Sequence, residues 1–355
     1  MSRFFSAKYK DLVPYTPGEQ PKSMDKIVKL NTNECPFPPS EKALAFAQSH
    51  TRALNLYPEL HCIDVRRKLA ELHGIDPENI VLGNGSDELL NFATMAYCDA
   101  QTPAVFPHIS YGFYPVYAAI NRVPFDEIPL RPDFSIAPED YDALGRTIFI
   151  ANPNAPTGLC LTVEQIEHIL SHNPDNVVII DEAYIDFGGE TCIPLIKRYD
   201  NLLVVQTFSK SRSMAGARLG FAAGDKKLID DLNAIKFSIN PYNVNSMTLA
   251  LGLGVLLDEA QTRRNCRTIM ENRAYTAAAL EALGFEVLPS SANFVFAASP
   301  RIGGRELYLK LKERGVLIRH FDRPEIAAYV RITIGTREQM DILLRHVREI
   351  LEETT

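Results

Sequence analysis

The sequence has few cysteines, and none of the six belongs to a C-x-x-C pair. They are scattered through the chain, at positions 35, 62, 98, 160, 192 and 266. This spacing argues against a zinc knuckle and against a disulfide framework, and the sequence predicts no metal site. Free thiols are typical of a reducing compartment, so we expect a cytoplasmic protein.

Long apolar and long basic runs are absent as well. No segment approaches the roughly 20 apolar residues of a membrane helix, and the first residues lead into Lys8, Lys10 and Asp11 without an apolar region. We therefore expect no signal peptide and no membrane contact. The net charge of -7 and the lack of a basic run argue against binding to nucleic acid.

What the chain does contain is typical of a soluble globular protein. Its 355 residues are 46% apolar and 23% charged, and a length well above about 150 residues favours two domains. No internal repeat is evident. Residues 1–40 are rich in proline and polar residues and are expected to form an extended arm.

From about residue 41, helical segments alternate with short apolar strands. Expected helices are 41–50, 64–73 and 87–98, and expected strands are 79–82, 104–106, 147–151, 177–180, 202–206 and 219–223. The strands are continuous apolar runs, which indicates burial on both faces. We therefore predict an α/β fold, with a mostly parallel sheet covered by helices.

The stretch from about 226 to 285 is expected to be mostly helical, and the last hundred residues differ from the rest. Strands at 285–288, 294–297, 317–319 and 329–334, with helices at 304–314 and 337–353, predict a smaller α+β module. We predict a large domain over 41–245, and a small domain that combines 246–355 with the arm, 1–40.

Polar clusters directly follow four of the apolar strands. They are Gly83–Asp87, Asn152–Gly158, Asp181–Tyr184 and Thr207–Lys210. In an open parallel sheet, ligands bind beyond the carboxyl ends of the strands. One such cluster could be turn chemistry or a helix cap, but four that meet at one sheet edge predict a site.

The residue types in these clusters point to one cofactor. The amine of Lys210 can form a Schiff base with an aldehyde, and the carboxylate of Asp181 can hold a pyridine nitrogen protonated. Arg218, eight residues after Lys210, can bind a phosphate, as can the amides at a helix start near Ser86. A lone lysine is usually a surface residue, but an aldehyde, a pyridine and a phosphate together describe pyridoxal phosphate.

Motifs along nearly the whole chain resemble fold-type I, pyridoxal-phosphate-dependent aminotransferases, and within them the histidinol-phosphate aminotransferase family. The motifs that carry this resemblance are Leu30–Glu34, Leu56–Glu59, Gly83–Glu88, Ser110–Tyr111, Pro156–Gly158, Asp181–Tyr184, Ser209–Lys210, Arg218 and Tyr329–Thr336. The resemblance implies amino-group transfer between L-histidinol phosphate and 2-oxoglutarate or glutamate, in histidine biosynthesis.

The resemblance also implies roles for single residues. Lys210 would hold the cofactor and move a proton, Asp181 would pair with the pyridine nitrogen, and Tyr184 would donate to the ring oxygen. Tyr111 would stack on the ring. The phosphate would be bound by Gly85, Ser86, Thr207, Ser209 and Arg218, and by Tyr57 from a second subunit, which implies a homodimer.

One position departs from the family pattern. Most relatives carry asparagine where this chain has Ala155, and that asparagine bonds the ring oxygen. Either Asn154 or Asn152 compensates, or Tyr184 serves alone.

The substrate pocket is also assigned from the resemblance. Arg331 is expected to receive a substrate carboxylate, and Arg319 and Tyr15 the phosphate of histidinol phosphate. Asn33 and Tyr242 are further pocket candidates.

Three other hypotheses about the function remain open. A phosphothreonine decarboxylase of this fold usually begins with His-Gly-Gly-Asn, which is absent here. An aromatic-amino-acid aminotransferase is disfavoured by the presence of both Tyr15 and Arg319. A non-enzymatic relative is disfavoured because Lys210, Asp181, Tyr184 and Arg218 occur together.

Overall fold

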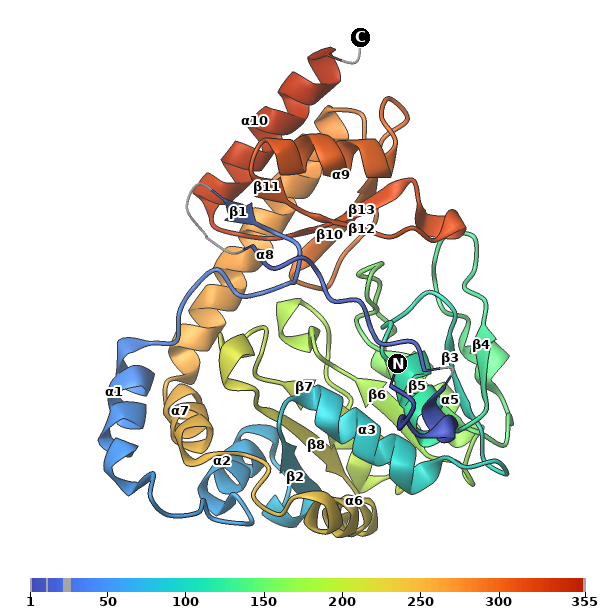
Figure 1. Ribbon diagram of the computed structural model, residues 1–355, viewed down its shortest axis with the longest axis vertical. Coiled ribbons are helices and arrows are strands. Elements are labelled where there is room, and N and C mark those ends of the chain that lie inside the picture. Colours follow the sequence, from blue (N-terminus) through green and yellow to red (C-terminus); the bar gives the residue numbers. More distant parts are fainter. Residues whose placement is uncertain (1, 11, 22–26, 354–355) are drawn as a thin grey trace.

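The computed structural model describes residues 2–10, 12–21 and 27–353, and its centre is a seven-stranded sheet (Figure 1). The strand order is β2-β8-β7-β6-β5-β3-β4. The strands are β2 (Ile80–Gly83), β3 (Ala104–Pro107), β4 (Phe125–Ile128), β5 (Thr147–Ala151), β6 (Val178–Asp181), β7 (Leu202–Thr207) and β8 (Gly220–Gly224). The predicted α/β fold is confirmed.

Both faces of this sheet are buried except at its edge strand β4, because alternate residues of the other strands belong to two different apolar cores. In β5, Ile148 and Ile150 pack into one core, whereas Phe149 and Ala151 pack into the other. Burial on both sides is why these strands are apolar throughout rather than alternating.

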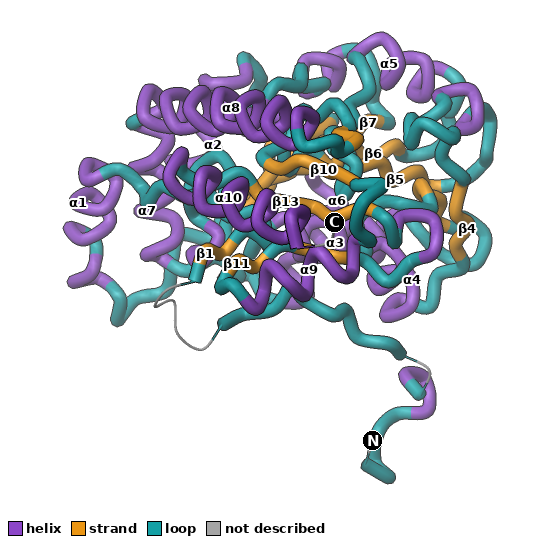
Figure 2. Tube along the Cα trace, turned by 90° about the horizontal axis from the view of Figure 1, so that it is seen from above, coloured by secondary structure: helices purple, strands orange, loops and turns teal. Residues whose placement is uncertain are grey.

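Helices cover the two faces. The first core also contains α2 (Ile63–His73), α5 (Val163–Ser171) and α7 (Ser246–Leu257), and α1 (Glu41–Ser49) packs on α7. The second core contains α3 (Ser86–Tyr97), α4 (Tyr114–Asn121) and α6 (Lys226–Ile239). Figure 2 shows α1, α2 and α7 together at one end of the molecule.

Two strands differ from a simple parallel sheet. β8 is antiparallel to both of its neighbours, β7 and β2. The connection from Thr207 to Gly220 contains the 3-10 helix Ala215–Ala217 and no α-helix, and the chain returns antiparallel. β4 was not predicted, because it is an edge strand with exposed polar residues rather than an apolar run.

The C-terminal part forms a second layered unit. A four-stranded antiparallel sheet has the order β12-β13-β10-β9, and α9 (Gly304–Glu313) and α10 (Arg337–Glu353) cover it. Its strands are β9 (Glu286–Val287), β10 (Phe294–Ala298), β12 (Arg319–His320) and β13 (Tyr329–Thr333). The N-terminal arm joins this unit, since β1 (Val28–Lys29) pairs with β11 (Val316–Leu317).

The long helix α8 (Glu259–Ala282) runs from α7 into the C-terminal unit (Figure 1). Cys266, Ile269 and Leu280 of α8 pack in the C-terminal core, whereas Val255 and Leu256 of α7 pack in the core of the large sheet. The domain division stays a prediction, and we propose to move its boundary from residue 245 to about Asp258. No helix in the described part of the chain is long and apolar enough to cross a membrane.

Candidate active site

Five strands deliver polar residues to one edge of the large sheet. β2, β5, β6 and β7 end there, and antiparallel β8 begins there. Ala151 lies opposite Asp181, and Thr207 lies opposite Gly220, which also pairs with Gly83. The four predicted clusters therefore meet, and β8 adds Arg218 to them.

Gly220 permits a close approach of backbone at this edge. A Cβ atom at this position would lie 2.5 Å from the Ser86 nitrogen and 2.6 Å from the Gly85 carbonyl carbon. The turn before α3 therefore packs directly on the start of β8. Gly85 itself has a φ of 81°, in the left-handed region that glycine adopts without strain.

A cavity of about 160 Å³ opens at the sheet edge. It is lined by residues from the arm, the α3 start and the strand ends: Thr32, Glu34, Ser86, Asp87, Tyr111, Ala151, Ala155, Asp181, Ala183, Tyr184, Thr207, Ser209, Lys210, Ala215 and Arg218. Most of the predicted cofactor residues are therefore brought together.

The Lys210 amine points into this cavity between the arm and the sheet. Its Nζ atom donates to the Thr32 carbonyl oxygen at 3.3 Å and lies 5.8 Å from the centre of the Tyr184 ring. No carboxylate in the described part of the chain forms an ion pair with Lys210. The amine is thus available to a ligand in the cavity.

Asp181, at the end of β6, is a buried carboxyl group, 5% exposed. Burial raises its pKa to about 7, although the Ala183 amide and the Tyr114 hydroxyl donate hydrogen bonds to it. Of the described residues, no cation is among the main influences on this carboxyl group. A cation in the cavity beside Asp181 would restore its ionised form.

Arg218 is held by Asp87 in the first turn of α3. Its Nη2 atom donates to Asp87 Oδ2 at 2.9 Å, and its Nη1 atom donates to Ser209 Oγ at 3.3 Å. The hydroxyl groups of Tyr111 and Tyr117 donate to the other oxygen of Asp87, at 2.6 and 2.9 Å. Asp87 was not among the predicted site residues, although it closes the Gly83–Asp87 cluster.

The hydroxyl groups of Thr207 and Ser209 lie beside Arg218. Thr207 Oγ1 donates to Ser209 Oγ at 3.0 Å, and the Ser209 amide donates to Thr207 Oγ1 at 3.1 Å. Ser86 is the first residue of α3, and the free amides of a helix start favour a negative group. These donors converge on the same side of the cavity as Arg218.

Asn154 and Asn152 do not line the cavity. The Asn154 amide donates to Ile109 O and Thr157 Oγ1 and accepts from Ser110. Asn152 exchanges two hydrogen bonds with Leu161. The structure therefore does not bring either asparagine to the place left by Ala155.

Asn33, by contrast, contacts the hydroxyl group of Tyr184. Its Nδ2 atom donates to the Tyr184 hydroxyl at 2.9 Å, and its Oδ1 atom accepts from Thr333 Oγ1 at 3.0 Å. Tyr184 also packs edge-on against Phe294. The arm and the C-terminal unit thus fix the orientation of Tyr184.

The cavity widens toward the C-terminal unit into a cleft that also contains Tyr15, Asn33, Arg319 and Arg331. Arg319 and Arg331 lie directly opposite each other on β12 and β13, where like charges repel. Burial lowers the pKa of Arg331, and the nearby Arg319 lowers it further. Arg331 Nε is buried and has no hydrogen-bond partner among the described residues.

Such a pair of arginines is suited to an anion. Among the residues that the structure describes, Arg331 has one hydrogen-bond acceptor, the Asn31 carbonyl oxygen, and Arg319 makes two long contacts, to Thr16 O and Pro17 O. Tyr15 stacks on Phe113 at the same cleft, with ring centres 4.2 Å apart.

Tyr57 and Tyr242 are not part of this cavity within one chain. Their rings stack on each other, with centres 4.3 Å apart. Tyr57 is 79% exposed, on a loop between α1 and α2.

Comparisons with known proteins agree with this arrangement. Residues 25–347 match the family model described as aminotransferase class I and II. The chain is 47% identical to the histidinol-phosphate aminotransferase of Brachyspira hyodysenteriae over 356 residues, which cover 99% of this chain and 100% of that protein.

Two solved structures share the fold. Histidinol-phosphate aminotransferase from Sinorhizobium meliloti, in complex with pyridoxal-5'-phosphate, has a TM-score of 0.89 at 21% identity, and covers 100% of this chain and 99% of its own. L-threonine-O-3-phosphate decarboxylase from Porphyromonas gingivalis has a TM-score of 0.79 at 24% identity, and covers 92% of this chain and 100% of its own. Because both reactions occur on this fold, the fold alone does not fix the reaction.

The family match over most of the length, and the high identity to a relative covered from end to end, agree with the lysine, carboxyl and arginine groups at the sheet edge. The chain belongs to the aminotransferase class I and II family.

Proposed function

We propose that this chain is a pyridoxal-phosphate-dependent aminotransferase that moves the amino group between L-histidinol phosphate and 2-oxoglutarate. The observation that carries the proposal is the 47% identity with the Brachyspira hyodysenteriae enzyme over the full length of both chains. A decarboxylase of the same fold is less well supported, because its likeness to this chain is confined to the fold.

The cavity fits pyridoxal phosphate in three independent ways. Asp181 is a buried carboxyl group without a cation, which a protonated pyridine nitrogen would supply. Arg218, Ser209, Thr207 and the α3 start would hold the phosphate. Lys210 points into the space between these two ends.

When bound, pyridoxal phosphate supplies an aldehyde that takes up an amino group and a ring that withdraws electrons from the substrate. Lys210 would first hold the aldehyde and then, with its free amine, carry a proton to and from the substrate carbon. Tyr184 would donate its hydroxyl hydrogen toward the ring oxygen, because its oxygen already accepts from Asn33. Asn33 would therefore orient Tyr184. Tyr184 would then make the hydrogen bond to the ring oxygen that relatives make with an asparagine at position 155.

The two substrates share an anionic group but not its shape. Histidinol phosphate has a phosphate and no α-carboxylate, whereas glutamate has two carboxylates. Arg319 and Arg331 would bind either anion, since a guanidinium group pairs with carboxylate and with phosphate. Tyr15 would add a neutral donor at the phosphate end.

We also propose a homodimer in which Tyr57 of the partner subunit completes each phosphate site. The stacked rings of Tyr57 and Tyr242 bring together two segments, the α1–α2 connection and the end of α6 with the loop after it. Both segments carry exposed apolar side chains: Leu54, Leu56, Tyr57, Phe237, Ile239 and Tyr242. An exposed apolar patch of this kind marks an interaction site. A two-fold arrangement would make both active sites equivalent.

A cytoplasmic location is part of the same proposal. All six cysteines are unpaired in the structure, as in a reducing compartment. Cell fractionation that finds the enzyme outside the cytoplasm would contradict it.

Borohydride reduction of the cofactor-loaded protein should attach the cofactor covalently to Lys210. Peptide mapping by mass spectrometry checks this, and Lys236 is the informative alternative because it is a buried lysine whose pKa is lowered by burial. An adduct on Lys236, or on no lysine, would show that Lys210 is wrongly assigned. Lys210→Ala should lose turnover but still bind the cofactor.

Asp181→Asn should lower kcat far more than Tyr184→Phe. We expect a loss of about tenfold for Tyr184→Phe, which removes one neutral hydrogen bond, and at least about 100-fold for Asp181→Asn, which removes a charge-assisted bond and the ring charge. Steady-state kinetics of both variants test the ranking. Equal losses would rule it out.

Mixing two inactive variants tests the shared site. Lys210→Ala and Tyr57→Ala should each have low activity as pure dimers. Subunit exchange between them should restore activity, because the mixed dimer has one site with Lys210 from one chain and Tyr57 from the other. Activity that stays low, in mixed dimers verified by mass spectrometry, would place Tyr57 outside the partner's site.

Arg319→Ala should weaken histidinol phosphate more than glutamate, because a charged donor to a phosphate contributes about 1.5–3 kcal/mol, or roughly 10- to 150-fold in kcat/KM. The matched control is Arg323→Ala, in the same cleft, since Arg323 is already engaged by the His108 carbonyl oxygen and by Glu325. An equal loss for both substrates would contradict this assignment. A protein that reacts with glutamate but not with histidinol phosphate would remain an aminotransferase with a different second substrate.

A further inference from the structure

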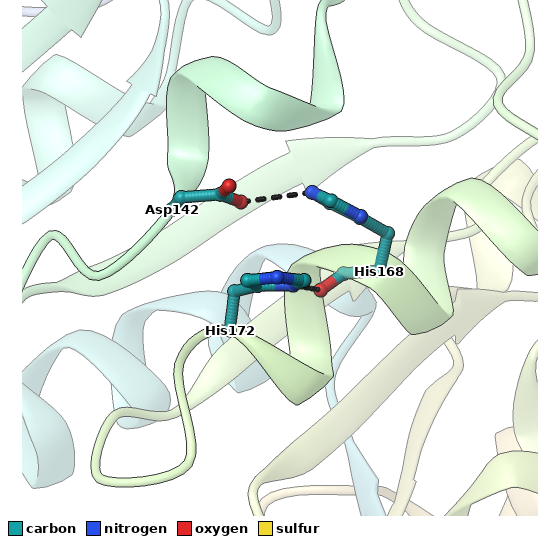
Figure 3. Close-up of side chains that lie close together, drawn as sticks. All are labelled: Asp142, His168 and His172. Carbon is teal, nitrogen blue, oxygen red and sulfur yellow. Dashed lines mark hydrogen bonds and ion pairs between the residues drawn. The ribbon is translucent and has the colours of Figure 1, made fainter.

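A cluster of three potential metal ligands lies outside the active site, at the C-terminal end of α5 (Figure 3). His168 is in the last turn of α5, and His172 is the residue that caps it. Asp142 follows the 3-10 helix Pro138–Tyr141. One ligand atom of each residue lies within 4.8 Å of the other two, the one such group of three among the described residues.

The spacing of the two histidines places them on one face of the helix. Residues four apart are neighbours on a helix surface, and the two rings stack with centres 4.1 Å apart and planes at 28°. His168 Nε2 lies 2.9 Å from Asp142 Oδ1. The Asp142 carboxylate therefore faces the side of α5 that carries the His168 ring, as Figure 3 shows.

The segment that carries Asp142 is fastened to the end of α5. The Ala143 amide donates to the His172 carbonyl oxygen at 3.1 Å, and the Leu144 amide donates to Asn173 Oδ1 at 3.2 Å. The buried Asn173 amide donates in turn to Tyr141 O at 2.7 Å. The three side chains thus stand on a rigid frame, which a metal site requires.

His172 is oriented as a metal ligand usually is. Its Nδ1 atom lies 2.8 Å from the His168 carbonyl oxygen, so the Nδ1 hydrogen is donated there and the Nε2 lone pair faces outward. Ligating histidines usually donate their second nitrogen to a carbonyl or carboxylate oxygen in this way. His50 makes the same contact at the end of α1, so what distinguishes this cluster is the second imidazole stacked beside the pair of His168 and Asp142.

We propose that Asp142, His168 and His172 bind a divalent transition-metal ion of the zinc class. Imidazole and carboxylate ligands suit Zn²⁺, which takes about 2.0–2.2 Å to nitrogen and oxygen in tetrahedral sites, with water in the remaining position. The three side chains are partly or fully exposed, so small rotations can draw their ligand atoms together. The ion would tie α5 to the segment before β5.

This proposal goes against the expectation from the sequence that no metal site is present, and it is independent of the proposed enzymatic function. None of the three residues lines the cavity of Lys210. The ion would therefore stabilise the fold, and removing it with a chelator should leave transaminase turnover unchanged.

Titration of the cofactor-loaded protein, without a histidine tag, with ZnCl2 alone tests the site. Calorimetry should give one ion bound per chain at this cluster and a higher melting temperature, because a ligand of the native state stabilises it. His172→Gln and Asp142→Asn should each weaken Zn²⁺ binding about 10- to 100-fold or more. Both changes keep a polar group of similar size, which protects the fold.

His50→Gln is the matched control. His50 caps α1 and has the same contact, from Nδ1 to the carbonyl oxygen four residues earlier, but that residue is Phe46 rather than histidine. The control should bind Zn²⁺ like the wild type. Binding that is absent in the wild type, or equal in all four proteins, would overturn the proposal.

Discussion

The structure depends on one constraint, which is that the large sheet is buried on both faces. Strand interiors such as Ile148–Ile150 contribute only apolar side chains, to one core or the other. Polar groups are therefore confined to the strand ends, and parallel strands present equivalent ends at the same edge. The antiparallel return of β8 adds Arg218 at that edge, beside Lys210 from the same short connection.

The N-terminal arm connects the two halves of the site. Asn33 donates to Tyr184 of the large unit, and its backbone amide and side chain both contact Thr333 of β13. Asn293 donates to the Asn33 carbonyl oxygen as well. The bonds of Asn33 to Thr333 and Asn293 are buried, and the bond to Tyr184 is partly buried, so Asn33 connects the C-terminal unit to the Tyr184 hydroxyl.

Two arginines with buried polar atoms, Arg212 and Arg331, differ in whether a carboxylate of the protein compensates their charge. Arg212, next to the site, is 3% exposed and pairs with Asp186, which also accepts from Ser211. Its charge is compensated within the protein. Arg331 has another arginine opposite it and a backbone carbonyl oxygen as its partner. A buried cation without a carboxylate is costly, and a substrate anion offsets that cost.

The sequence by itself determined the apolar strands, the polar clusters after them and the residue types of the cofactor site, because strand burial and turn chemistry are local in the chain. It also placed the ends of α1, α2, α3, α9 and α10 within one residue, whereas α4 and α5 were not predicted and α6, α7 and α8 were expected only as one mostly helical stretch. Tertiary structure decided what depends on distant neighbours: the direction of β8, the exposed strand β4, the contact of Asn33 with Tyr184 and the pairing of Arg319 with Arg331.

Asn154 shows most clearly what the sequence alone could not predict. Its neighbours in sequence pointed to the cofactor, but hydrogen bonds to Ile109 and Ser110, more than forty residues earlier, hold its side chain away from the cavity.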